Sequence, residues 1–184
     1  MASMARIHDP SGRTVTTERL HLRPFAPDDV DWYAAIRAKP EVVRHLPGGE
    51  PTAARARPIA EATAPHFAGL WREVGYGPWA VVERQSGRPL GHAGVRLLPE
   101  LGETEILYML DTPAWGRGYA TEAGRAARDF SFELLKLPRL IAFAVPENTA
   151  STHVMEKLGM ICEGVFPAFG LEVVRYGIAN PAAL

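Results

Sequence analysis

The stretch PAWGRGYATEAGRAARDF, from Pro113 to Phe130, decides how the rest of the chain is interpreted. Gly116 and Gly118 stand directly before a helical repeat. Its apolar residues recur at steps of three and four: Ala120, Ala123, Ala127, Phe130 and Leu134. A glycine-containing loop that leads into a helix offers free backbone N–H groups and the positive end of the helix dipole, which together bind phosphate. The alternative is a tight turn that packs the helix closely on a strand.

The segments around this loop predict strands. Residues 78–84 and 89–98 are β-rich and are joined by a hairpin signal at Ser86-Gly87. ETEILYML, residues 103–110, predicts a third strand before the loop. RLIAFAV, residues 139–145, is almost wholly apolar, as is typical of a strand covered on both faces.

The two ends of the chain add further elements. ERLHLRPF, residues 18–25, alternates like a half-buried strand, and Asp28 is a candidate N-cap of the helix that follows. Residues 52–74 predict one or two helices, interrupted near Pro58 or Pro65. A helix capped by Asn148 and strands over residues 160–167 and 171–179 complete the chain.

These elements predict an α+β fold in which one β-helix-β unit joins parallel strands. We expect residues 1–15 to be a flexible lead-in and residues 16–184 to be a single domain. The glycine loop follows the carboxyl end of a strand and opens the crossover helix, which is where α/β sheets bind ligands. The phosphate interpretation of Gly116 and Gly118 is therefore the better one.

Composition narrows the classes of function. The 184 residues carry a formal net charge of −1, which argues against nucleic acid as a partner because binding its phosphates requires clustered Lys and Arg. Cys162 is the one cysteine, so neither an internal disulfide nor a cysteine-based metal site is expected. MASMARIHDPSGR has no apolar core of a signal peptide, and no apolar stretch reaches membrane-spanning length. We expect a cytoplasmic protein that needs neither a metal nor a membrane.

Five motifs in order resemble the GNAT family of N-acetyltransferases, in the branch of the ribosomal-protein-alanine acetyltransferases of the RimJ/RimL type. They are TERLHLRPF, GHAGV, EILYML, WGRGYATEA and NTASTHVMEKLGM, and together they span most of residues 16–178. The resemblance implies a mixed, twisted sheet of about seven strands flanked by about four helices. It also implies an acyl-CoA, with acetyl-CoA as the expected cosubstrate, in a cleft where strands 103–110 and 139–145 splay apart.

The resemblance assigns the pyrophosphate loop to Trp115–Ala120. Gly118 and Ala120 match the family pattern, whereas Trp115 departs from it at the first position. The Arg117 side chain is either an adenosine-phosphate ligand or a solvated charge. The residues expected to bind acyl-CoA are Met109, Leu110, Gly116, Arg117, Gly118, Tyr119, Ala120, Thr121, Asn148 and Ser151.

The expected reaction transfers an acyl group directly to a primary amine. By resemblance, the Leu110 N–H stabilises the oxyanion, the Ser151 hydroxyl assists the departing thiolate, and Glu105 acts as a base through water. The alternatives are structural: Glu105 as a strand charge or cross-strand pair, and Ser151 in a plain helix cap.

The other notable side chains are given structural or secondary roles. Tyr108 is expected to pack in the core, and His45 and His92 are second candidates for the base. Trp32, Phe67, Trp71 and Trp79 are assigned to the core or to the wall of the acceptor site.

Two alternative functions stay open. One keeps the fold but uses succinyl-CoA or another acyl donor, and a basic residue in the acyl pocket would favour it. The other is a non-catalytic acyl-CoA-binding module. Whether the amine belongs to a protein N-terminus or to a small molecule, and whether the chain forms a homodimer, are left open.

Overall fold

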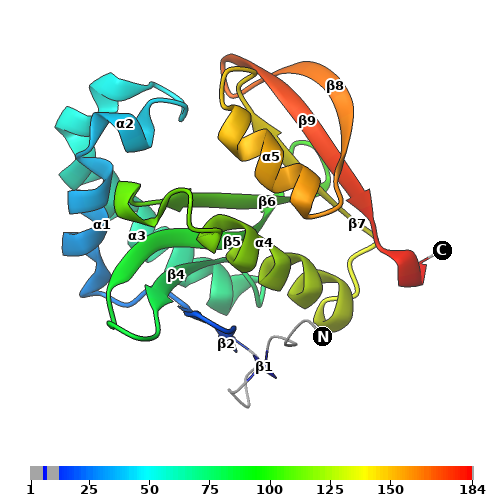
Figure 1. The fold of residues 1–184 in the computed structure, drawn as a ribbon, viewed down its shortest axis with the longest axis horizontal. Coiled ribbons are helices and arrows are strands. Elements are labelled where there is room, and N and C mark those ends of the chain that lie inside the picture. Colours follow the sequence, from blue (N-terminus) through cyan, green and yellow to red (C-terminus); the bar gives the residue numbers. More distant parts are fainter. Residues whose placement is uncertain (1–5, 8–12, 184) are drawn as a thin grey trace.

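The computed structural model describes residues 6–7 and 13–183, in which one mixed sheet is covered by helices on both faces (Figure 1). The strands are β1 (Arg6–Ile7), β2 (Val15–Thr16), β3 (Leu20–Arg23), β4 (Pro78–Glu83), β5 (Pro89–Leu98), β6 (Glu103–Leu110), β7 (Arg139–Ala144), β8 (Ile161–Ala168) and β9 (Leu171–Ala179). The α-helices are α1 (Asp29–Arg37), α2 (Pro40–Val43), α3 (Ala56–Glu73), α4 (Tyr119–Asp129) and α5 (Thr149–Lys157).

The sheet order within the described residues is β1-β2-β3-β4-β5-β6-β7-β9-β8. Neighbouring strands are antiparallel except β6 and β7, which are parallel and are connected through α4. The expected α+β fold with a mixed sheet is therefore confirmed, and the seven expected strands correspond to β3–β9. The short strands β1 and β2 and the one-turn helix α2 were not predicted.

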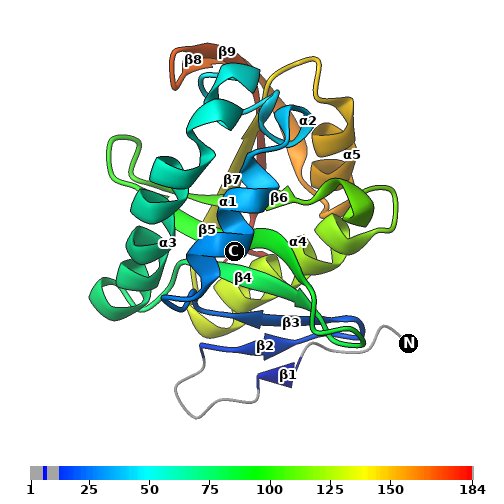
Figure 2. The same cartoon turned by 90° about the vertical axis from the view of Figure 1, so that its left-hand side faces the viewer.

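The two faces of the sheet carry separate hydrophobic clusters. On one face, α4 and α5 pack against side chains such as Leu90, Ile106 and Leu140. On the other face, α1, α2 and α3 enclose a cluster around Tyr33, Phe67 and Met109. Figure 2 shows α1 and α3 on the opposite side of the sheet from α4 and α5. β7 lies between these layers, and Leu140, Ile141 and Ala142 are fully buried, as its continuous apolar sequence predicts.

The sheet begins earlier in the chain than the sequence suggested. Val15 is 1% exposed, and β2 pairs with both β1 and β3. Pairing with β3 extends the sheet into the expected lead-in, residues 1–15, because Val15 can bury its side chain in the main cluster. Residues 1–5 and 8–12 of that lead-in lie outside the described residues.

Two helices differ in detail from expectation. α3 runs without a break from Ala56 to Glu73 and includes Pro65. After α4 the chain widens into a π-helical turn, Phe130–Leu134, so the 3.6-residue period no longer applies. Phe130 is buried as predicted, but Leu134 is 48% exposed.

Candidate active site

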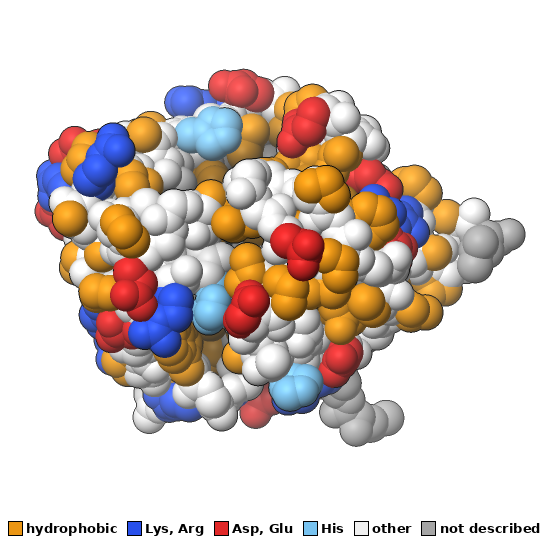
Figure 3. Space-filling view, turned by 90° about the horizontal axis from the view of Figure 1, so that it is seen from above, with side chains coloured by type: hydrophobic (Ala, Val, Ile, Leu, Met, Phe, Trp, Pro, Cys, Tyr) orange, Lys and Arg blue, Asp and Glu red, His pale blue; other side chains and the backbone are white. Residues whose placement is uncertain are grey.

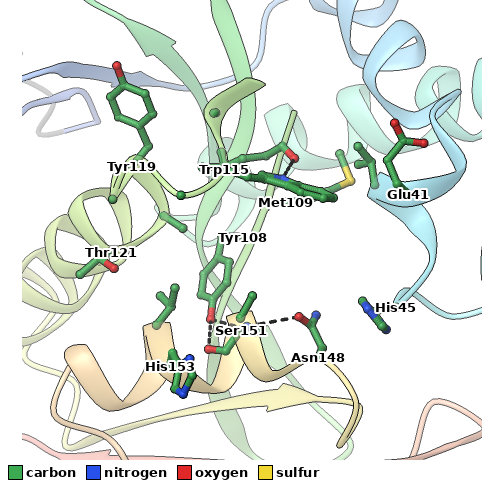
Figure 4. A pocket seen from close by; sticks show the side chains of 18 of the residues that line it. Glu41, His45, Tyr108, Met109, Trp115, Tyr119, Thr121, Asn148, Ser151 and His153 are labelled. Carbon is green, nitrogen blue, oxygen red and sulfur yellow. Dashed lines mark hydrogen bonds between the residues drawn. The ribbon is translucent and has the colours of Figure 1, made fainter. Parts of the chain in front are cut away.

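A cavity of about 460 Å³ lies between the end of β6, the start of α4, the start of α5 and the α2 region. Figure 4 shows Tyr108 and Met109 of β6 between Trp115 on one side and Ser151 and Asn148 on the other. The expected acyl-CoA ligands line it with one exception, Arg117. Those that line it are Met109, Leu110, Gly116, Gly118, Tyr119, Ala120, Thr121, Asn148 and Ser151.

The cavity exists because β6 and β7 diverge. β6 pairs with β5 along its whole length, from Leu98↔Glu103 to Gly91↔Leu110. Its register with β7, in the described part of the chain, consists of the single pair Glu105↔Ile141. Beyond this pair, no further residue of β6 is paired in register with β7, so the polar backbone groups on that edge are left for another partner.

Leu110 presents its backbone to this open edge. The Asp111 N–H donates to the Leu90 carbonyl at 2.7 Å, so it points toward β5. Because successive peptide groups of a strand point to opposite edges, the Leu110 N–H points into the opening. The Leu110 carbonyl points the same way and accepts a hydrogen bond from the Trp115 indole at 2.8 Å. By the same alternation the Met109 backbone faces β5, so Met109 lines the cavity through its side chain.

The glycine loop forms the second wall. Gly118 is the N-cap of α4 and has a φ of +79°, a left-handed conformation that favours glycine. The Glu122 N–H donates to the Gly118 carbonyl at 3.0 Å, so the N–H groups of Tyr119, Ala120 and Thr121 precede the first intrahelical bond. A row of free N–H groups at a helix N-terminus fits a diphosphate.

Arg19 and Glu122 fix this loop in place. The Glu122 carboxylate accepts hydrogen bonds from the Thr17 hydroxyl at 2.6 Å and from the Arg19 N–H at 2.8 Å, and it pairs with Arg19 Nε at 2.6 Å. Arg19 Nη1 also donates to the Arg117 carbonyl at 2.8 Å. The turn before β3 therefore holds the start of α4, 98 residues later in the chain.

Arg117 is the one expected acyl-CoA ligand that does not line the cavity. Its side chain is 54% exposed, lies 4.9 Å from the centre of the Tyr119 ring and is 3.7 Å from Glu83. The Tyr119 hydroxyl donates to Glu83, and this hydrogen bond raises the pKa of Tyr119. The structure thus gives the Arg117 side chain protein partners at the rim of the loop.

Ser151 and Tyr108 form the third wall. The Tyr108 hydroxyl lies 2.9 Å from Ser151 Oγ and donates to the Ser151 carbonyl at 3.0 Å (Figure 4). Burial raises the pKa of Tyr108 to about 12, so the phenol keeps its proton at neutral pH. Asn148 caps α5 as predicted, because its side chain accepts from the Ser151 N–H at 3.2 Å. The cap places the Ser151 hydroxyl beside β6.

Glu105, the expected base, is not among the residues that line the cavity. It is 6% exposed, and its carboxylate pairs with Arg96 Nε at 2.7 Å, directly across from it on β5. Burial raises the pKa of Glu105, while the Arg96 guanidinium opposes this shift. Since the geometry brings Glu105 to Arg96 and not to Ser151, it favours the cross-strand pair, and the catalytic role of Glu105 stays a prediction.

The two histidines considered as bases lie in different surroundings. His45 lines the cavity near Asn148 (Figure 4). His92 is 6% exposed and its Nδ1 lies 3.0 Å from the Tyr33 hydroxyl. Burial, together with Arg37 and Arg96, lowers the pKa of His92 to about 3, so it is neutral and enclosed.

Sequence reasoning missed the side chains that α2 and α5 contribute to the cavity, such as Glu41 and His153, and it misjudged two others. Tyr108 was expected in the core, but its side chain reaches Ser151 where β6 and β7 diverge. Trp115 was noted as a departure from the loop pattern, but its indole N–H is the donor to Leu110. A partly buried indole N–H usually donates a hydrogen bond, and this tendency was the signal that could have identified Trp115. Of the four aromatics assigned to the core or to the acceptor-site wall, Phe67, Trp71 and Trp79 belong to the core, since they are 5%, 1% and 0% exposed, whereas Trp32 is half-buried at the edge of a core cluster.

The face of the molecule drawn in Figure 3 has no large cluster of basic side chains. In the view from above, Lys and Arg side chains are interspersed with Asp, Glu, His and apolar side chains (Figure 3). Within residues 6–7 and 13–183, no group of three or more His, Cys, Asp or Glu could hold a metal ion. The described helices include none that is long and apolar enough to cross a membrane.

Comparisons with known proteins identify the family and the fold. The family model of the acetyltransferase (GNAT) domain matches residues 19–161. The N-acetyltransferase YnaD of Bacillus subtilis is 30% identical over 156 residues, which are 83% of this chain and 85% of that protein. The crystal structure of an acetyltransferase from Agrobacterium tumefaciens matches with a TM-score of 0.75 at 29% identity, over 97% of this chain and 99% of that one.

The ribosomal-protein-S5-alanine acetyltransferase of Vibrio fischeri has the same fold. It matches with a TM-score of 0.76 at 17% identity, over 93% of this chain and 98% of that one. At this identity the match concerns the fold.

Proposed function

The chain belongs to the acetyltransferase (GNAT) domain family, and we propose that this N-acetyltransferase moves an acetyl group from acetyl-CoA to a primary amine by direct attack in a ternary complex. The observation that carries the proposal is a single cavity that joins the start of α4, the open edge of β6 at Leu110 and Ser151 of α5. These are a phosphate-binding element, an oxyanion donor and a hydroxyl beside the leaving group.

The cavity fits acyl-CoA in its chemistry. The N–H groups of Tyr119, Ala120 and Thr121 would hold the diphosphate, and Gly118 lets it approach the backbone closely. The free edge of β6 would pair with the amide groups of the pantetheine arm as an added strand does. Asn148 borders the same path at the start of α5.

The reaction balances without any further co-reactant. The amine nitrogen attacks the thioester carbonyl carbon, the C–S bond breaks, and the proton lost by nitrogen ends on sulfur. The Leu110 N–H would donate to the oxygen that becomes negative, because it points into the cavity and belongs to a strand that β5 holds rigidly. The Ser151 hydroxyl would donate to the departing thiolate, with the protonated Tyr108 phenol fixing its position.

An ammonium ion has to lose a proton before it attacks. Glu41, His45 and His153 line the cavity and are the nearest bases, while Glu105 acts at most through a chain of water. Glu41→Gln, His45→Gln, His153→Gln and Glu105→Gln separate these four candidates by their pH–rate profiles. The variant that removes the base loses most turnover at low pH and recovers partly as free amine accumulates. A variant whose profile matches that of the wild type in shape and height has lost no base.

Release of the CoA thiol across a panel of amines tests the function. The panel contains N-terminal peptides, polyamines, aminoglycosides and amino acids, and mass spectrometry identifies the acetylated product. We expect thiol release that depends on one class of amine and a product one acetyl group heavier. Binding of acetyl-CoA without thiol release for any amine would instead indicate a non-catalytic acyl-CoA-binding module.

A further inference from the structure

Arg37, in the last turn of α1, is a buried cation for which the structure provides no anion. It is 8% exposed. In the described part of the chain, no carboxylate lies within ion-pair distance of its guanidinium. Its Nε is buried and has no hydrogen-bond partner there. Because arginine stays protonated in proteins, the charge persists at any working pH.

The groups around Arg37 are neutral. Nη1 lies 3.8 Å from the Met109 sulfur, which is a weak acceptor, and the guanidinium lies 5.9 Å from the centre of the Tyr33 ring. Tyr33 in turn contacts His92, and both are uncharged because burial raises the pKa of Tyr33 and lowers that of His92. The nearest groups therefore leave the positive charge unbalanced.

Other arginines that support the sheet are paired. Arg23 donates twice to Asp29, at 2.7 and 2.8 Å, and Arg96 pairs with Glu105 at 2.7 Å. A buried charge without a partner costs free energy, and proteins tolerate such a cost mainly at functional sites. The missing anion is therefore expected to come from a ligand.

Arg37 lies behind one end of the cavity. Met109, whose sulfur contacts Arg37, lines that cavity, as does Val42 of α2. Figure 4 shows the Met109 sulfur on the side of the cavity where Glu41 lies, away from Thr121 and Tyr119 of the phosphate loop. The Met109 side chain is unbranched and has three rotatable bonds, so a change of rotamer would expose the guanidinium to the cavity.

We propose that Arg37 and the Tyr33 hydroxyl form a carboxylate-binding subsite behind Met109. The proposal rests on the acyl transfer from CoA to an amine proposed above, whichever acyl group is moved, and narrows the substrates to those with a carboxylate near the reacting centre. That carboxylate has two sources: the far end of a dicarboxylic acyl group on CoA, or the free α-carboxylate of an amino-acid acceptor. Either would form the bidentate pair for which a guanidinium is shaped.

The test compares matched probes on wild type, Arg37→Met and Arg57→Met. Methionine keeps much of the arginine stem but removes the charge. Arg57 serves as the control because its side chain is 58% exposed and pairs with Asp31 and Glu61 on the surface. The acyl arm measures Kd for succinyl-CoA and acetyl-CoA. The acceptor arm measures, at saturating acetyl-CoA, kcat/KM and thermal stabilisation for each amino acid and for its amide.

We expect wild type and Arg57→Met to favour the carboxylate-bearing probe at least about tenfold in one arm, and Arg37→Met to lose that preference. Preference in the acyl arm identifies a dicarboxylic acyl donor, and preference in the acceptor arm identifies an amino acid. If the wild type shows no preference for the carboxylate-bearing probe in either arm, the proposal is overturned, whatever the variants do. A preference that Arg37→Met retains also overturns it.

Stability and cofactor binding separate this proposal from its alternatives. Without ligand, Arg37→Met is expected to unfold at the same temperature as wild type or higher, because an unpaired buried charge is removed. Marked destabilisation together with unchanged selectivity would make Arg37 structural. Acetyl-CoA should stabilise all three proteins equally. If acetyl-CoA stabilises none of them, the proposed function fails, whereas equal stabilisation without carboxylate preference overturns the subsite alone.

Discussion

At the scale of single residues, the contact between Tyr108 and Ser151 is where fold and chemistry meet. The 2.9 Å separation of their hydroxyl oxygens requires both the splay of β6 from β7 and the Asn148 cap of α5. A serine hydroxyl rotates freely unless a neighbour holds it, and Tyr108 supplies that neighbour.

We therefore predict that Ser151→Ala lowers kcat by about a hundredfold, the usual range of acid catalysis, and changes the Kd of acetyl-CoA much less. Tyr108→Phe should lower kcat by a smaller factor, because it frees Ser151 without removing it. Initial rates measure kcat for both variants, and a binding titration measures the Kd of acetyl-CoA. Equal rates in wild type and Ser151→Ala, with only a loss of stability, would reduce Ser151 to a helix-cap residue.

The buried His92 predicts a pH dependence of stability. Its folded pKa of about 3 is below the ordinary value of 6.5, so between these values the unfolded chain binds more protons. The contribution of neutral His92 is therefore complete above pH 6.5 and is lost as the pH falls toward 3. Between pH 7 and pH 5 the loss is about 2 kcal/mol.

Urea unfolding of wild type and His92→Gln at both pH values measures this contribution. The free energy of unfolding of wild type should fall by about 2 kcal/mol more than that of the variant, since glutamine does not titrate. Parallel pH profiles would show that His92 is solvated in the folded protein.

Sequence reasoning at this scale worked where a residue type has one common use. Asn148 was expected as a cap, and the structure agrees. Gly118 was expected where a diphosphate approaches the backbone; the structure gives it a left-handed φ at the start of α4, and the approach itself stays a prediction. Arg37 and Tyr108 could not be found in this way, because their surroundings come from α1, β5 and β6 and exist only in the folded chain. A glutamate on a strand can act as a base or form a cross-strand ion pair. Only the strand register, which places Arg96 opposite Glu105, favours the ion pair.

At the scale of elements, the glycine loop and α4 carry the phosphate-binding hypothesis. The periodicity of residues 119–129 predicted α4, and the strands β4–β9 were found close to their predicted limits because hairpin and alternation signals are local. β1 and β2 were missed because two-residue strands have no detectable alternation. The π-helical turn after Asp129 depends on packing and left no signal in the sequence.

Gly118→Val tests the role of this element against a matched glycine. Gly87, in the hairpin between β4 and β5, also has a positive φ, +69°, and nothing lies within 4 Å of an added Cβ. Both substitutions should cost roughly 1–2 kcal/mol of stability, because a left-handed backbone disfavours a side chain.

Acetyl-CoA at a hundredfold excess over its Kd should stabilise wild type and Gly87→Val by about 2.7 kcal/mol. Gly118→Val should lose this stabilisation, because the valine side chain fills the space at the start of α4. Retained stabilisation of Gly118→Val in a thermal scan would place the diphosphate elsewhere.

At the scale of the whole molecule, the order of strands brings distant segments together at one point. β6 and β7 belong to the sheet centre, α4 crosses between them, and α5 follows β7, so residues 110, 118 and 151 surround one cavity. The α1–α2 region closes the remaining side with Glu41, His45 and, behind Met109, Arg37. The sheet centre is the part that the sequence motifs predicted. The α1–α2 wall is the part that we propose to select the substrates, and it carried no recognisable motif.

The most direct measurement of the central claim is a crystal structure of the protein with acetyl-CoA. The account predicts the diphosphate on the N–H groups of residues 119–121, the pantetheine arm along the open edge of β6, and the sulfur within hydrogen-bond distance of Ser151 Oγ. A thioester bound away from Leu110 and Ser151, or a diphosphate that does not contact the start of α4, would contradict it.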